Sequence, residues 1–202
     1  MSALRKISSL GRYGLNRPTM KRIDRRFSFK KIVLLQQMLG NKFVRYKSDS
    51  MNYGIIGIQI NDNGYAFTNY IEVDDYYGKM EDVAKFKVNK VAYDEIHSPF
   101  QEPHMNEKLI DCLVKEVYVI NEKQTLYIND KITYEVRLTR GVIFKFEEGY
   151  ELSIEKNVWF SEVMSLEIGH NLINTFTPVE EFSDDWCEPC RGECIREIIK
   201  LS

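Results

Sequence analysis

Three cysteines near the C-terminus have residue types and spacing that could support metal chemistry. Cys187, Cys190 and Cys194 follow a C-x2-C-x3-C pattern, and Pro189 and Gly192 between them favour the chain reversal that a chelating loop needs. Thiolates are soft ligands that select zinc or an iron–sulfur cluster, but the spacing matches neither ferredoxin pattern. The sequence therefore indicates zinc as the metal to consider at these three residues.

A tetrahedral zinc ion needs a fourth ligand, and the pattern does not supply one locally. Cys112 and His170 are the two candidates elsewhere in the chain. The alternative interpretation is structural: three small, partly buried cysteines would pack around Trp186, with an opportunistic disulfide between two of them.

Positive charge is concentrated at the N-terminus. Residues 1–31 hold ten Lys/Arg and one acid, a net charge of +9, whereas residues 32–202 hold 18 bases and 29 acids, a net charge of −11. Basic clusters bind phosphate backbones by releasing counterions, and they also bind acidic proteins. The residues predicted to contact nucleic acid or an acidic partner are Arg5, Lys6, Arg12, Arg17, Lys21, Arg22, Arg25, Arg26, Lys30 and Lys31.

This charge division predicts a basic N-terminal arm at 1–31 and a β-rich globular domain at 32–202. The arm contains Gly11, Gly14 and Pro18 and has little apolar area to bury, so we expect it to be separate from the body. Two alternatives stay open. It is a tail, solvated or folded back on the acidic body, or it is an organellar transit peptide, whose composition is also rich in Arg and Ser.

Two adjacent aromatic residues interrupt the alternating pattern of the C-terminal half. Trp159 and Phe160 would point to opposite faces of an extended chain, so we expect one of them to be exposed as an anchor for a protein partner. A bulge that buries both rings is the alternative.

No catalytic motif supports the interpretation of this chain as an enzyme. The chain has no P-loop, no dinucleotide-binding glycine pattern, no nucleophile elbow and no HExxH. Active sites also assemble from residues distant in sequence, so the absence of motifs favours a binding protein without excluding an enzyme.

The elements that would position these residues are mostly strands. Between Lys131 and Ile168 apolar and polar residues alternate in four successive runs, which predicts antiparallel strands with one face on a core and one in water. Glu148-Gly149 separates two of the runs and predicts a tight hairpin. A second hairpin is expected at Tyr53–Val73, around the turn at Asn61–Gly64.

One helix is predicted at Ser28–Leu39, where Ser28 is a good N-cap and Gly40 a stop. Tyr93–Lys108 lacks periodicity and is expected to connect two β subunits or to form a long loop. The predicted fold is mainly β, or β-rich α+β. Antiparallel meander and hairpin sheets would form a sandwich or a partly open barrel with one covering helix.

Composition restricts the setting. The chain has 44% hydrophobic and 29% charged residues, and no window approaches the roughly 20 apolar residues of a membrane helix. Four cysteines, three of them crowded together, are unlike a secreted disulfide scaffold, and no secretory signal is visible, so we expect a cytoplasmic protein.

The function predicted from these features is a non-enzymatic binding or inhibitory module. Its acidic β body would contact a basic protein partner and its basic arm would fasten the complex. An inhibitor encoded by a mobile element or phage is one protein of this kind. Two alternatives remain: a nucleic-acid-binding protein that uses the arm, and a zinc-dependent enzyme or zinc-stabilised module.

Overall fold

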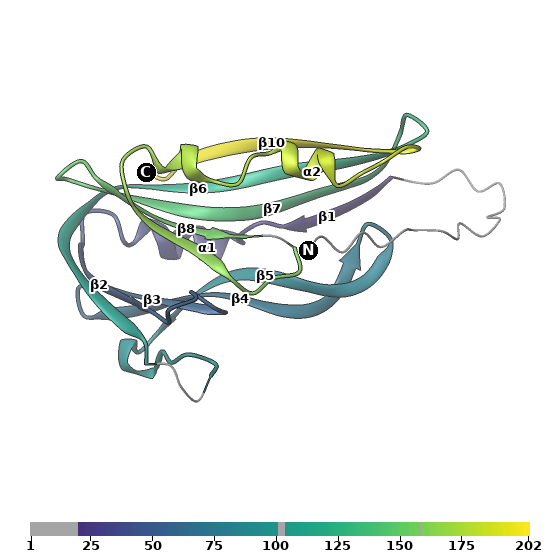
Figure 1. Ribbon diagram of the computed structural model, residues 1–202. Helices are drawn as coiled ribbons and strands as arrows, with labels where there is room; N and C mark the ends of the chain where they lie inside the picture. The colour runs from purple at the N-terminus through teal and green to yellow at the C-terminus, as the bar shows by residue number, and fades with distance from the viewer. Residues whose placement is uncertain (1–19, 101–103, 158) are drawn as a thin grey trace.

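The computed structural model describes residues 20–100, 104–157 and 159–202 (Figure 1). Their elements, in chain order, are β1 Lys21–Arg25, α1 Phe29–Gln36, β2 Lys42–Ser48, β3 Ile55–Ile60, β4 Asn63–Tyr76, β5 Lys79–Val91, the 3-10 helix η1 Tyr93–Glu95, β6 Asn106–Ile128, β7 Lys131–Phe146, β8 Glu151–Lys156, β9 Met164–Gly169, the 3-10 helix η2 Leu172–Thr175, α2 Glu180–Asp184 and β10 Cys190–Lys200.

The strands form one sheet that bends into two facing layers. Its order is β5-β4-β3-β2-β6-β7-β8-β9, with β10 beside β6 and β1 beside β7. In Figure 1, β2 to β5 lie below the layer that contains β6, β7 and β10. The long strand β6 belongs to both layers, because its first half pairs with β2 and its second half with β10. The sheet does not close into a barrel, and the predicted β-rich antiparallel fold is confirmed.

Aromatic residues from both layers fill the space between them. Phe43 on β2, Phe67 on β4 and Phe144 on β7 are fully buried. The ring of Phe144 meets those of Phe43 and Phe67 edge to face, with centroids 5.6 and 6.1 Å apart. Burial of such side chains is the main favourable term in folding, so this cluster holds the two layers together.

Several local predictions are confirmed. The alternation that begins at Ile132 forms β7, and the chain turns back into β8 at Gly149, whose φ of +92° suits glycine. The hairpin around Asn61 joins β3 to β4. Residues 106–128 form one continuous strand, β6. The aperiodic stretch at 93–108 contains η1 and, from Asn106, the start of β6.

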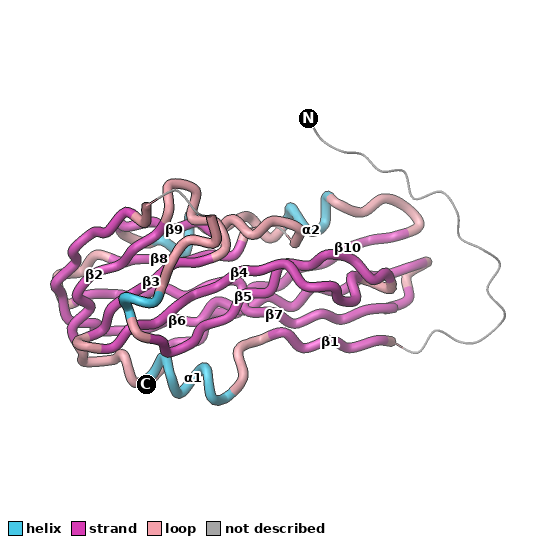
Figure 2. Tube along the Cα trace, turned by 90° about the horizontal axis from the view of Figure 1, so that it is seen from below, coloured by secondary structure: helices cyan, strands magenta, loops and turns pink. Residues whose placement is uncertain are grey.

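Helix α1 lies within the stretch predicted to be helical. Ser28 is its N-cap, and the chain leaves the helical region by Gly40, with a φ of +69°. Leu35 is fully buried in the main core, so α1 covers one end of the layers. Figure 2 shows α1 close to the C-terminus, and the side-chain amide of Gln36 donates a 2.9 Å hydrogen bond to the carbonyl of Ser202.

The strand β1 corrects the boundary expected after Lys31. Residues 21–25 pair in parallel with 134–138 of β7, and α1 begins at Phe29, so residues 21–31 are part of the body. The physical reason is that Ile23 packs against a small core formed with Val136, Leu138 and Trp159. Charge counting alone misses this, because the partner strand lies more than a hundred residues later.

Candidate functional site

The structure divides the predicted basic residues into two groups. Arg5, Lys6, Arg12 and Arg17 lie outside the described residues, and their role stays a prediction. Three of the others form ion pairs within the chain: Lys21 with Asp75, Arg25 with Asp74 at 2.9 Å, and Arg26 with Asp24 at 2.6 Å. Arg22 and Lys30 are exposed, and the ammonium of Lys31 donates a hydrogen bond to Asn89.

The three cysteines do not converge on one point. Cys190 and Cys194 both belong to β10, where four residues span about 13 Å at about 3.3 Å per residue, and Cys187 is exposed before the strand. The structure therefore does not group these three thiols as a chelating loop would, and zinc at Cys187, Cys190 and Cys194 stays a prediction. Over residues 20–100, 104–157 and 159–202, no group of three or more His, Cys, Asp or Glu side chains is placed to hold a metal ion.

Neither candidate for the fourth zinc ligand lies beside this stretch in the sheet. Cys112 is opposite Phe43 in the half of β6 that pairs with β2, whereas Cys194 is opposite Gln124 in the other half. His170 contacts the carbonyl of Gly149 at 3.1 Å. The strand geometry separates residues that the sequence spacing grouped together.

These positions predict an order of thiol reactivity. Burial, together with the charge of Glu122, raises the pKa of Cys194 to about 12, and burial also raises the pKa of Cys190. Because the thiolate is the nucleophile, we expect iodoacetamide at pH 8 to alkylate exposed Cys187 first and Cys194 last. Mass spectrometry of peptides from timed samples measures the order, and Cys194 reacting as fast as Cys187 would contradict this placement.

The two adjacent aromatics do point to different surroundings, as expected. Trp159 is buried against Val83, Val136 and Leu138, so it is not a free surface anchor. Phe160 is 51% exposed, and its ring packs edge to face on Tyr76 with centroids 4.7 Å apart. Of the two predicted anchors, Phe160 is the one that a partner can reach.

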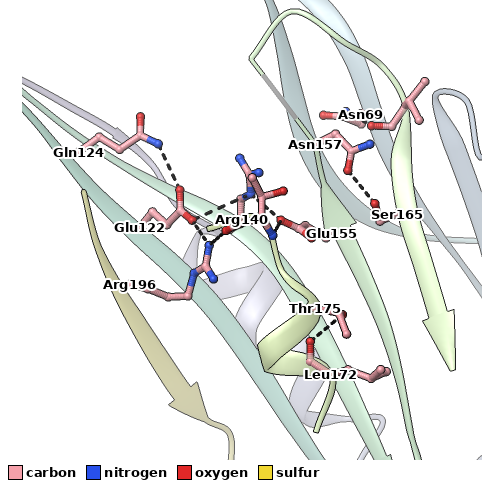
Figure 3. A network of polar contacts seen from close by, with 12 residues as sticks. Asn69, Glu122, Gln124, Arg140, Glu155, Asn157, Ser165, Leu172, Thr175 and Arg196 are labelled. Atoms are coloured by element: carbon pink, nitrogen blue, oxygen red, sulfur yellow. Dashed lines mark hydrogen bonds and ion pairs between the residues drawn. The ribbon is translucent and has the colours of Figure 1, made fainter. Parts of the chain in front are cut away.

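A buried ionic network lies between β6, β7, β8 and β10 (Figure 3). The guanidinium of Arg140 donates to Glu155 at 2.9 Å and lies 4.0 Å from Glu122. Arg196 donates to the same Glu122 oxygen at 2.6 Å, and the amide of Gln124 donates to its other oxygen at 3.1 Å. Two carboxylates and two guanidiniums balance, so the arrangement favours a structural role over acid–base chemistry.

The network fixes the segment that crosses the outer face of the sheet. The backbone N–H of Thr177 donates to Glu155 at 3.0 Å, and the Thr177 carbonyl accepts a hydrogen bond from Arg196. Thr177 stands directly before the turn into α2, whose Phe182 is buried beside Tyr77 and Trp186. Since both backbone groups of Thr177 are held, α2 has a defined position on the sheet.

Sequence reasoning missed this network. Glu122, Arg140 and Glu155 stand in or beside apolar runs, and Arg140 directly precedes Gly141 and the run that starts at Val142. A charged residue inside a strand that is otherwise buried is a weak signal of a buried pair, because an unpaired charge there is costly. The four members come from four strands, and no spacing rule connects them.

The outer face of α2 is acidic. Residues 178–190 contain five carboxylates and no Lys or Arg. In the described part of the chain, none of these five forms an ion pair: Glu180, Glu181, Asp184, Asp185 and Glu188. Burial and the neighbouring charge of Asp184 raise the pKa of Asp185. We call these five carboxylates together with Phe160 the acidic surface.

A small cavity of about 80 Å³ lies under the acidic surface, lined by Phe160, Glu181, Asp185 and Cys194 among others. Small-molecule sites usually occupy about 300–1,000 Å³, so this space does not fit a substrate. The shared cavity does show that Phe160 and the carboxylates of α2 are neighbours.

Comparison of the chain with protein-family models, with curated proteins and with solved structures gave no match. In the part of the chain that the structure describes, no helix has both the length and the apolarity needed to cross a membrane. The functional argument therefore depends on the geometry of the chain itself.

Proposed function

We infer that this chain is a non-enzymatic binding protein, and that it docks on a basic protein partner through the acidic surface. The observation that carries the proposal is the group of five carboxylates without an ion-pair partner among the described residues. Several carboxylates elsewhere are engaged: Glu72 and Asp74 pair with Lys85, and Asp75 pairs with Lys21. The negative charge of the five carboxylates is not neutralised by ion pairs within the described residues, so it is available to a basic partner.

Charge of one sign on a fixed segment supports fast and selective association. Complementary potentials steer a partner and raise the association rate, and like-charged proteins are rejected. The buried network holds Thr177 by both backbone groups, so the carboxylates of α2 are positioned before binding. On a partner that binds nucleic acid they would take the place of phosphates, which is how an inhibitory module would act.

Phe160 supplies the apolar contact that charges lack. Interface energy is concentrated in a few aromatic or Arg side chains surrounded by polar groups that exclude water. Phe160 is half exposed, rests on Tyr76 and borders Glu181 and Asp185 across the small cavity. Phe160 is therefore placed as an apolar anchor surrounded by negatively charged side chains.

The test is affinity capture from the native cell extract with the full chain and two charge variants. One variant neutralises the acidic surface: E180Q/E181Q/D184N/D185N. The control removes the same charge from exposed acids without ion pairs in the structure: E81Q/D82N/D94N/E95Q. We expect the wild type and the control to retain a partner that the first variant does not retain. About 0.5 M salt should release this partner, because salt screens surface charges.

Phe160→Ala should weaken the same capture without a change in net charge. If both four-residue variants lose the partner equally, general acidity and not the acidic surface is responsible, and the proposal fails. If no salt-sensitive partner is found with the wild type, docking on a basic protein is excluded.

A further inference from the structure

A second cavity lies between the two layers of the sheet, apart from the cavity under α2 except that Trp159 lines both. It is an open cleft of about 260 Å³. Its walls are Ala84–Lys87 of β5, Arg25–Ser28 between β1 and α1, Leu138 and Thr139 of β7, and Lys156 at the end of β8. Nothing in the sequence pattern indicated it, because five separate segments contribute.

The residues that line this cleft include six basic side chains and no carboxylate. The six are Arg25, Arg26, Lys31, Lys85, Lys87 and Lys156. Four of the six form ion pairs with carboxylates that do not line the cleft. Asp74 pairs with Arg25 and Lys85, Glu72 pairs with Lys87, and Asp24 pairs with Arg26. Lys31 and Lys156 have no carboxylate partner among the residues the structure describes.

Lys156 is the feature that distinguishes this cleft from a basic surface. Its side chain is buried, with 3% of the residue exposed, and its ammonium donates one hydrogen bond, to the carbonyl of Ala84 at 2.7 Å. An ammonium has three donors, and a buried charge is unfavourable unless it is paired. An anion in the cleft would supply the missing partner.

Arg25 lines the same cleft and lies near the same aromatic ring. The guanidinium of Arg25 and the ammonium of Lys156 lie 5.2 and 5.3 Å from the centre of the Trp159 ring. Nη1 of Arg25 is buried and has no hydrogen-bond partner. Two cations that share one aromatic ring repel each other, and a negative group between them would relieve the repulsion and satisfy Nη1.

Apart from Ser28 and Thr139, the rest of the cleft is apolar. Phe27 and Phe86 stack with their centroids 5.4 Å apart, and Ala84, Leu138 and Trp159 complete the surface. A few polar groups that fix orientation inside a mostly apolar lining are typical of small-molecule sites. At about 30 Å³ for each atom-sized group, as in liquid water, the space holds a ligand of roughly nine non-hydrogen atoms.

We propose that this cleft binds a small amphipathic carboxylate, with its head group between Arg25 and Lys156 and its apolar body on Phe27, Phe86 and Trp159. The proposal goes beyond docking on a protein partner and does not depend on it. A medium-chain fatty acid such as octanoate has the required charge, shape and size.

The charge state of Lys156 links the binding to pH. Burial, and after it the positive charges of Arg140 on β7 and Arg25 on β1, lower the pKa of Lys156 to about 7, while Glu122 on β6 opposes them. Asp74 on β4 raises the pKa of Lys85 on β5, so Lys85 stays charged. Above pH 7 the free protein loses the Lys156 proton, so carboxylate binding must take up a proton and weakens as pH rises.

Isothermal titration calorimetry of the full chain with octanoate, 1-octanol, acetate and octyl phosphate tests the site. We expect octanoate to bind with one-to-one stoichiometry. Octanol and acetate should each bind at least about ten times more weakly, because each lacks either the charge or the apolar body. Octyl phosphate tests whether the cleft prefers a phosphate or a carboxylate head group. If octyl phosphate binds more tightly than octanoate, the assignment to a carboxylate is overturned.

Lys156→Met removes the buried charge and keeps a side chain of similar length. It should weaken octanoate at least about tenfold and change octanol little. Lys90→Met, which removes an exposed charge outside the cleft, should change neither. Raising the pH from 6 to 9 should weaken octanoate about tenfold or more in the wild type and not in the Lys156→Met protein.

Several results would overturn the proposal. They are no octanoate binding by the wild type at millimolar concentration, equal binding of octanoate and octanol, or equal affinities of the wild type and Lys156→Met. If Lys156→Met does not fold, as judged by circular dichroism, the pH series on the wild type decides. An octanoate affinity that does not change between pH 6 and pH 9 contradicts the role of Lys156.

Discussion

Replacing Arg140 with methionine should lower the free energy of unfolding by about 3–5 kcal/mol, the range found when one partner of a buried ion pair is removed. Arg140 is buried, and its guanidinium neutralises Glu155 at 2.9 Å and lies 4.0 Å from Glu122. Without it, Glu155 is a buried carboxylate with no cation. Guanidinium denaturation followed by circular dichroism measures the change.

Two variants separate the network from a general effect of charge. Arg137→Met on the same strand removes an exposed arginine that pairs with Glu135, and we expect a change below about 1 kcal/mol. In the double variant Arg140→Met, Glu155→Gln, both charges are gone and the glutamine oxygen still accepts from Thr177. It should regain part of the lost stability. Equal losses in Arg140→Met and Arg137→Met would show that the network is not important for folding.

Phe144→Ala should also destabilise the protein by about 3–5 kcal/mol, since truncation of a buried phenylalanine removes apolar contact and leaves a cavity. The ring is fully buried where the two layers meet, in edge-to-face contact with Phe43 and Phe67. The same denaturation experiment measures the loss.

Phe29→Ala is the matched control for that experiment. Phe29 is 81% exposed at the start of α1, and surface substitutions usually stay within about 0.5 kcal/mol. If the two alanine variants unfold at the same denaturant concentration, the contacts of Phe144 between the layers do not contribute measurably to stability. That result would remove the basis for the cleft, which the same two layers enclose.

The proposed acidic surface and the proposed cleft can be examined separately in one protein. Neutralising the carboxylates of α2 leaves Lys156 and Arg25 untouched, and Lys156→Met leaves the α2 carboxylates untouched. Trp159 is the structural link, because it lines both cavities. Lys156→Met should lose octanoate binding and retain the protein partner, and neutralising the α2 carboxylates should do the reverse.

Local patterns in the sequence determined the strand content and many turns. The alternation from Ile132 places every second side chain on one face, and Gly149 tolerates the positive φ that the β7–β8 turn requires. These properties depend on neighbouring residues, so they can be read without a partner strand. The sequence led us to expect that one of Trp159 and Phe160 would be exposed, but not which; they lie in a turn, and the contacts of Trp159 with Val83, Val136 and Leu138 decide it.

Only the tertiary structure decided which strands pair and which charges meet. β1 joins β7, the cysteine stretch extends along β6 instead of closing on a metal, and Arg140 meets carboxylates from two other strands. Lys156 looks in sequence like any polar residue at the end of an alternating run, and its burial comes from Ala84 and Trp159 on distant segments. The physical reason is that burial and ion pairing depend on contacts between remote segments, which one-dimensional spacing does not record.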